Sequence, residues 1–171
     1  MKEKALPAER VSWLTRIRRN HALEHATIHI LSQMHYNIRL VGRSDPWGFT
    51  LAGEVSTEEV ASAIQEAIMR FKHGEVELAI HPRCGTNLAT SAVLAALSSF
   101  VAMGGRTHSR WEKLPRVLLA TMGALLVAQP LGLWAQQHIT TTSHVDGIHV
   151  KRLTRQQRGR VISHRIELEH R

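Results

Sequence analysis

Five consecutive residues near the start of the sequence, His21-Ala22-Leu23-Glu24-His25, bring two imidazoles and a carboxylate together. Residues 20–34 contain no Gly or Pro and carry apolar side chains at helical spacing, which predicts a helix. Because residues four apart share one face of a helix, His21 and His25 can reach one metal ion together, with Glu24 beside them. This H-x-x-E-H order reverses H-E-x-x-H. It predicts a divalent metal, Zn²⁺ or else Fe²⁺, with Glu24 taking a proton from water that the metal activates.

Two other interpretations of this helix remain open. The sequence contains 12 His, so the motif is also compatible with a His-rich helix whose imidazoles are solvated. His29 extends the same row by one more step of four. Three His in line on one rigid helix cannot easily surround a tetrahedral ion, so we expect His29 to support the site or the fold.

The elements that must position this helix follow it along the chain. Alternating apolar and polar residues predict strands over 37–43 and 47–55, joined as a hairpin by turn residues. Ser56-Thr57-Glu58-Glu59 has the pattern of a capping box, which predicts a helix over 57–73. A third strand is predicted over 75–81.

Cys84 comes directly after the predicted third strand and directly before an apolar helix. That position favours the thiolate form, which is the form that binds metals. A buried, inert cysteine is the alternative. His81, near the same strand end, is a second possible ligand, and an exposed His is equally compatible with its place.

Two stretches without charged residues follow, and they predict membrane spans over about 87–104 and 117–136. Small side chains recur in both, which suits close packing of helices in lipid. A pair of buried core helices is the alternative, although a soluble domain of this size could hardly cover both on all sides.

Net charge and composition limit the partners. A net charge of +8 points to nucleic acid or to an anionic membrane surface, but only 5% of the residues are aromatic, which argues against binding of single-stranded nucleic acid. A basic amphipathic helix predicted from Pro7 could lie on a membrane or pack on the domain. The charged N-terminus is not a signal peptide, and the lone cysteine fits a reducing compartment. We therefore expect an integral protein of a bacterial-type inner membrane with its soluble domain in the cytoplasm.

The fold class expected from this reading is α+β. Residues 1–84 form a metal-binding domain in which a small antiparallel sheet packs with two helices. Residues 85–137 form an inserted transmembrane hairpin of two helices. Residues 138–171 alternate as a further β-hairpin that can complete the sheet of the first domain.

The first domain resembles S-ribosylhomocysteine lyase. The matching pieces are His21 to His25, Gly48-Phe49, the helix that begins at Ser56 and Cys84-Gly85-Thr86. In that family both His and the Cys hold a divalent metal. The resemblance therefore implies His21, His25 and Cys84 as ligands and an acid/base role for Glu24.

The tail is similar to the hairpin that precedes the metal helix in the lyase family, which suggests a circular permutation. If so, His144 or His149 could line the site. The family's second, catalytic cysteine has no counterpart here, since Cys84 is the only cysteine. Asp45 could take its acid/base role, and turn formation explains Asp45 equally well.

Pitrilysin-like peptidases also carry H-x-x-E-H on a helix, and metal-assisted hydrolysis is compatible with both resemblances. The first hypothesis is a membrane-anchored metal-dependent hydrolase or lyase acting on a peptide or a small molecule, and an oligomer is possible. The second is a metal-binding membrane module without catalysis. The third is a metal-free basic adaptor for membranes or nucleic acid.

Overall fold

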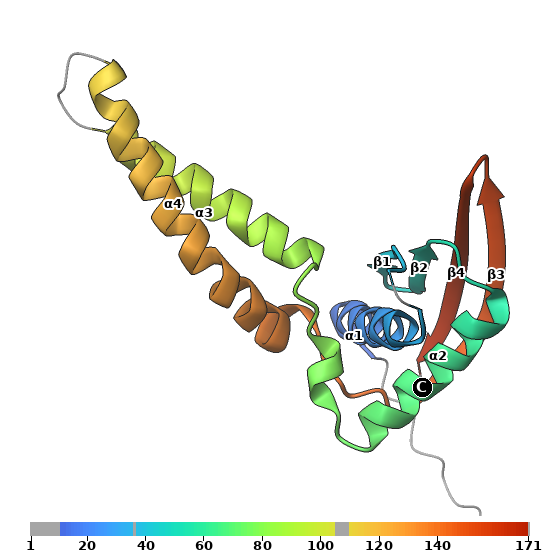
Figure 1. Ribbon diagram of the computed structural model, residues 1–171. Coiled ribbons are helices and arrows are strands. Elements are labelled where there is room, and N and C mark those ends of the chain that lie inside the picture. Colours follow the sequence, from blue (N-terminus) through green and yellow to red (C-terminus); the bar gives the residue numbers. More distant parts are fainter. Residues whose placement is uncertain (1–10, 36, 105–109, 171) are drawn as a thin grey trace, which may run out of the picture. The chain divides into compact units, whose positions relative to one another are not determined.

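The computed structural model describes residues 11–35, 37–104 and 110–170. The chain forms two compact units: one combines residues 1–80 with residues 140–171, and the other consists of residues 81–139 (Figure 1). Pro7, where a basic amphipathic helix was expected to begin, and residues 105–109 lie outside the described residues; the described part of that helix, from Trp13, is continuous with the helix that carries the motif.

Two helices belong to the first unit. Helix α1 (Trp13–Met34) begins at Ser12, whose hydroxyl accepts a hydrogen bond from the Thr15 amide at 3.2 Å. Helix α2 (Thr57–Lys72) begins with the predicted capping box, in which Ser56 and Glu59 each satisfy the other's backbone amide. These caps pair amides that helix termini otherwise leave without an intrahelical partner.

The sheet of this unit combines strands from both ends of the chain. Its four antiparallel strands are β1 (Val41–Asp45), β2 (Gly48–Ala52), β3 (Ile148–Arg158) and β4 (Val161–His170), and their order is β1-β2-β4-β3. Strand β4 pairs with β2, with Phe49 opposite Ile166. The predicted α+β fold is therefore confirmed, and the tail hairpin does complete the sheet.

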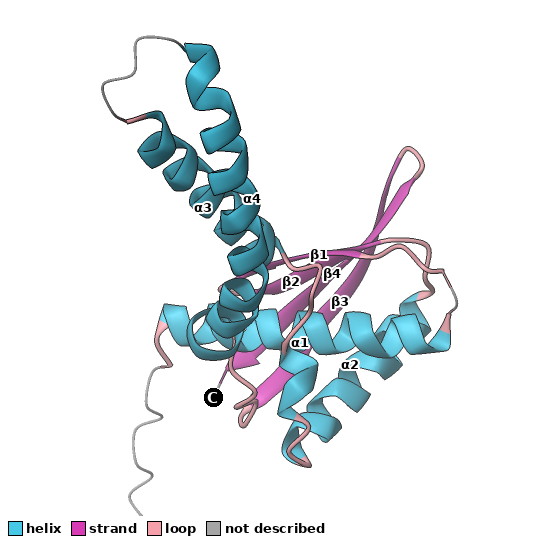
Figure 2. Ribbon diagram, turned by 60° about the vertical axis from the view of Figure 1, so that its left-hand side comes forward, coloured by secondary structure: helices cyan, strands magenta, loops and turns pink. Residues whose placement is uncertain are grey.

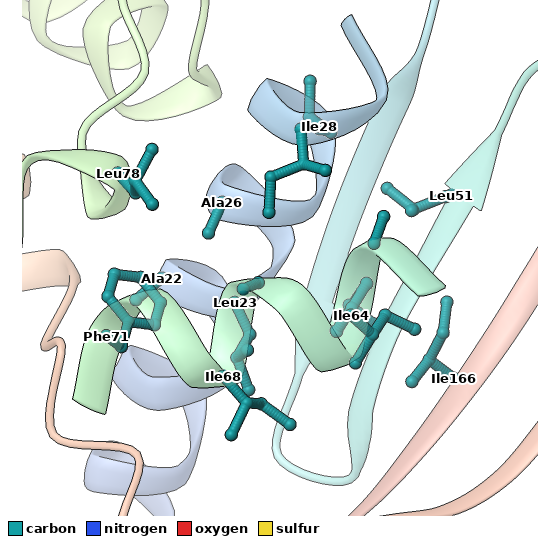
Figure 3. Close-up of a cluster of buried hydrophobic side chains, with 14 of the residues drawn as sticks. Ala22, Leu23, Ala26, Ile28, Leu51, Ile64, Ile68, Phe71, Leu78 and Ile166 are labelled. Carbon is teal, nitrogen blue, oxygen red and sulfur yellow. The ribbon is translucent and has the colours of Figure 1, made fainter. Parts of the chain in front are cut away.

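The hydrophobic core lies between the sheet and the two helices, which pack on the same face (Figures 2 and 3). Leu51 and Ile166 project from the sheet, Leu23 from α1 and Ile64 from α2, and all four side chains are fully buried. The alternation of apolar residues along the strands places these side chains on one face, as expected for a two-layer fold.

The second unit contains helix α3 (Gly85–Met103) and helix α4 (Arg110–Ala135), which run side by side (Figure 1). A short π-helix, η2 (Gln136–Thr140), continues α4. Residues 85–103 and 113–140 are long and apolar enough to span a membrane, as predicted. Only 11% of the residues in each apolar window are buried, which does not fit the core helices of a soluble domain.

The predicted third strand over residues 75–81 is wrong. Val76–Ala79 form a 3-10 helix, η1, and no strand covers this segment. The carbonyls of Ala79 and Ile80 accept hydrogen bonds from His25 and His29 of α1, at 2.6 and 3.0 Å. Side chains of α1 thus supply partners that a neighbouring strand would otherwise provide.

The first two strands are both shorter than predicted, and the first is shifted along the chain. Strand β1 begins at Val41 rather than at residue 37 and continues through Asp45, which had been assigned to the turn. The turn consists of Pro46 and Trp47. This shift brings Ser44 into the strand, where its side chain contributes to the site described below.

Candidate metal centre

The H-x-x-E-H motif lies in the middle of α1, as predicted. The rings of His21 and His25 are neighbours, with their centroids 4.4 Å apart and their planes at 61°. His25 is 2% exposed and Glu24 is 5% exposed, so the solvated His-rich helix is not what the structure shows. Glu24 and His25 are therefore part of the interior, while His21 is half-buried.

Backbone carbonyls orient both imidazoles. His25 Nδ1 lies 2.6 Å from the Ala79 carbonyl oxygen, and His21 Nδ1 lies 3.2 Å from that of Thr140. A carbonyl oxygen can only accept, so each Nδ1 must carry the proton. In a neutral imidazole this leaves the Nε2 lone pair to bind a metal, which is the arrangement by which second-shell groups commonly orient metal-binding His.

His29 bonds its backbone carbonyl through the other ring nitrogen. Its Nε2 lies 3.0 Å from the Ile80 carbonyl oxygen, so Nε2 is the nitrogen that donates. His29 thereby anchors the end of η1 to α1. This agrees with the expectation that His29 supports the fold rather than completing a row of three ligands.

Glu24 is enclosed by strand β1. The Ser44 hydroxyl donates a hydrogen bond to its Oε2. A Cβ placed on Gly42 would overlap the Glu24 carboxyl group, so the glycine makes room for it. Burial raises the pKa of Glu24, and the Ser44 hydrogen bond and nearby His21 only partly oppose that effect. A carboxyl group with a raised pKa suits proton transfer.

Cys84 belongs to the second unit, where it caps the N-terminus of α3. It is 8% exposed, and its thiol accepts a hydrogen bond from the Thr86 amide at 3.3 Å. Cys84 follows Ala79, whose carbonyl bonds His25, by five residues. A fully extended chain of that length spans about 18 Å, which is the largest possible distance between the Cα atoms of Ala79 and Cys84. The assignment of Cys84 as the third ligand stays a prediction.

Two of the other candidates have local partners of their own. Asp45 makes a two-pronged ion pair with Arg165, at 2.7 and 2.9 Å. Partial burial would raise the pKa of Asp45, but hydrogen bonds from Arg165 and from the Trp47 amide lower it below its ordinary value. This is the setting of a structural carboxylate. His81 accepts a hydrogen bond from the Arg83 amide through Nδ1, at 3.3 Å.

His144 and His149 in the tail are both exposed. The tail itself does meet the metal helix, because the Arg18 guanidinium donates to the Thr141 carbonyl at 3.1 Å and the Thr142 amide donates to the Arg18 carbonyl at 3.3 Å. The residue that the tail directs at the motif is Thr140, through its backbone carbonyl.

Residues 16–153 match a family described as "Domain of unknown function (DUF6391)". The chain belongs to this family. The matched range contains both the motif on α1 and Cys84. A 139-residue alignment with an uncharacterized protein of Picosynechococcus shows 37% identity and covers 73% of this chain and 65% of the relative. No solved structure shows significant similarity to the chain.

The sequence reading missed Ser44 and Gly42, which hold Glu24 in this DUF6391 chain. A signal for both residues was present in the sequence. Ile38, Leu40 and Gly42 alternate on one side of the predicted strand, and the next residue on that side is Ser44. The carbonyls of Ala79 and Thr140 carried no such signal, because backbone groups of any residue type can orient an imidazole.

Proposed function

We propose that this protein is a membrane-anchored metal-dependent hydrolase in which His21, His25 and Cys84 bind a divalent metal and Glu24 transfers protons. The observation that carries the proposal is the pairing of each Nδ1 with a backbone carbonyl. That pairing selects, in both imidazoles, the tautomer whose Nε2 can bind a metal.

The chemistry of the donor set fits such a metal. His21, His25 and Cys84 are a group of described residues that could hold a metal ion with one ligand atom each. Two imidazole nitrogens and a thiolate suit Zn²⁺, and Fe²⁺ is the alternative. Three protein ligands would leave one position for substrate, as catalytic rather than structural zinc sites do.

When bound, the metal would polarise a substrate carbonyl and make water a better nucleophile near neutral pH. The protein would contribute Glu24, which accepts a proton from the attacking water and later delivers it to the leaving group. Ser44 and Gly42 hold the Glu24 carboxyl group in a fixed place for these transfers. Peptides and small amides or esters are the candidate substrates.

The membrane location is part of the same proposal. Two helices long and apolar enough to span a bilayer would return the chain to the side it left, so the α+β unit would remain on one side. We propose that this side is the cytoplasm, at a bacterial-type inner membrane. The lyase resemblance adds the alternative of lyase chemistry on a small molecule, and Cys84, the only cysteine, leaves no second thiol for it.

A metal-binding module without catalysis is the second candidate, and complete coordination by four protein groups would distinguish it from a catalytic site with one open position. The bonds from His21, His25 and His29 to backbone carbonyls are also what a structural His row without metal would make. A metal-free basic adaptor for membranes or nucleic acid is the remaining alternative, in view of the net charge of +8.

Elemental analysis of the untagged, detergent-solubilised chain tests the metal. We expect about one transition metal per chain, lost in His25→Ala and Cys84→Ser and kept in His144→Ala, which removes an exposed imidazole outside the motif. Glu24→Gln should keep the metal and lose hydrolysis of a panel of peptides, amides and esters.

Each outcome separates the candidates. Metal retained in Cys84→Ser but lost in His25→Ala would refute Cys84 as a ligand. Full metal binding with no hydrolysis of any panel member, and four protein ligands by X-ray absorption, would favour the module. Wild-type protein without metal after reconstitution would refute the metal site altogether.

A further inference from the structure

A buried pair of amide side chains lies at the base of the helical hairpin. Asn87 comes from the first turn of α3 and is 5% exposed, and Gln136 begins η2 and is 0% exposed. Gln136 Nε2 donates a hydrogen bond to Asn87 Oδ1 at 2.8 Å. Burying an amide is costly unless its groups are paired, so this pair must be satisfied by specific partners.

The other partners of the two amides are in one short segment. Gln136 Oε1 accepts from the His81 backbone amide at 2.9 Å, and Asn87 Nδ2 donates to the Pro82 carbonyl at 2.8 Å. The Asn87 backbone amide also donates to the Cys84 carbonyl at 3.0 Å. The two side chains thus hold residues 81 and 82, just before the cysteine, and the Asn87 backbone amide holds the carbonyl of Cys84 itself.

Two features of α4 and η2 permit this arrangement. Gln136 begins a π-helix, a widened turn that is often found at functional sites. Gly132 lies one helical turn earlier, and Asn87 occupies the space that a side chain at residue 132 would fill. A Cβ there would overlap the Asn87 amide and lie 3.1 Å from the Asn87 Cα. We call Asn87, Gly132 and Gln136 the hairpin-base cluster.

We propose that the hairpin-base cluster positions Cys84: it fixes the backbone of residues 81–87 and so sets where the thiolate is presented to a metal. The part of this inference that concerns the metal rests on the function proposed above. Groups that orient metal ligands typically change metal affinity 10–100-fold when they are removed.

Packing of the two helices alone does not account for the cluster. Apolar side chains of the same size would join α3 to α4 without burying four polar groups. The hydrogen bonds of the amides lead to residues 81–82, which lie in neither helix. By contrast, the hydrogen bond between Ser99 and Thr121, at 2.8 Å, joins only α3 to α4 and provides a control.

The test compares variants of the full chain in detergent. Gly132→Ala displaces Asn87 by steric overlap, and Gln136→Met removes the central amide. Gly123→Ala adds the same methyl group to the same helix where nothing lies within 4 Å, and Ser99→Ala removes a hydrogen bond that does not reach the Cys84 segment. Circular dichroism establishes that each variant keeps its helices.

Two measurements are made on each variant. The first is the rate at which a maleimide labels Cys84 in chelator-treated protein, which is unambiguous because Cys84 is the only cysteine. The second is binding of Co²⁺, followed through the thiolate-to-cobalt charge-transfer absorption that only coordination by Cys84 can give.

We expect Gly132→Ala and Gln136→Met to raise the labelling rate at least about tenfold. They should also weaken Co²⁺ binding about tenfold or more, with a diminished charge-transfer band. Gly123→Ala and Ser99→Ala should match the wild type in both. Wild-type labelling and cobalt spectra in the cluster variants would overturn the inference. If the wild type bound no metal, the proposed function would fail, and the labelling rates alone would support or overturn the positioning of Cys84.

Discussion

Replacing Gly42 with Ala should expel the Glu24 carboxyl group from its place beside Ser44. The added Cβ would coincide with the position of that group, and no positive backbone torsion forbids alanine at residue 42. The effect should therefore come from steric overlap with Glu24 and not from backbone strain. The change leaves His21 and His25 chemically unaltered, so the variant isolates Glu24.

The magnitude follows from three contributions. Overpacking in a filled interior costs about 1–3 kcal/mol. Losing the Ser44 hydrogen bond to a buried carboxyl costs about 1 kcal/mol more. Replacing Gly by Ala in a strand returns about 0.5–1 kcal/mol of backbone entropy. We expect Gly42→Ala to lower the free energy of unfolding by about 2 kcal/mol.

A double-mutant cycle with Glu24→Ala tests this reasoning. In the Glu24→Ala background the carboxyl group is gone, so Gly42→Ala should be neutral or slightly stabilising, which gives a coupling of about 2–3 kcal/mol. Urea unfolding in detergent, followed by far-UV circular dichroism, measures each corner. Equal destabilisation by Gly42→Ala in both backgrounds would refute the placement of Glu24 against Gly42. Gly42→Ala should also keep the metal and lose any activity that Glu24→Gln loses.

The remaining predictions concern stability. Burial, then Arg16 and Arg19, lower the pKa of His170 to about 4, so between about pH 6.5 and 4 the unfolded chain binds a proton that the folded chain does not. The free energy of unfolding should fall by about 1–2 kcal/mol as the pH drops through that range, which is less than the full pKa shift implies because the side chain is partly exposed. In urea melts, His170→Gln should flatten this part of the pH profile. Ser56→Ala should cost about 1 kcal/mol by removing the capping box of α2. Ser62→Ala, at an exposed position within the same helix, should cost nothing in the same melts, and equal effects of the two changes would contradict the capping role.

Local patterns predicted most elements of the fold. The capping box at Ser56, the helical spacing around His21 and the two charge-free stretches each depend on residues close together in the chain. The alternation in the tail likewise predicted a hairpin that completes the sheet. Such elements can be predicted from sequence because the side chains that favour the local helix or strand are also the ones that pack it against the rest of the fold.

The segment over 75–81 shows where local patterns fail. Val76, Leu78 and Ile80 alternate as a strand would, but a strand needs a neighbour to bond its carbonyls. Here His25 and His29 of α1 bond Ala79 and Ile80 instead. Contacts between distant segments decided the conformation, and the sequence carried no local sign of them.

The imidazoles of α1 also bond the chain on both sides of the inserted helical hairpin. Ala79 and Ile80 are the last residues before the helical hairpin leaves the α+β unit, and Thr140 is the first after it returns. Their carbonyls are held by His25, His29 and His21. Both points at which the hairpin is inserted are therefore bonded to one row of imidazoles. In His21 and His25 these bonds are donated by Nδ1, so they do not use the Nε2 lone pair that a metal needs. Removing a bound metal with a chelator should therefore leave the hairpin's ends attached to α1, and hydrogen exchange of the α1 amides, measured before and after chelation, checks this. Simultaneous loss of metal and of amide protection would mean that the metal, and not the carbonyl bonds, holds the two chain ends on the helix.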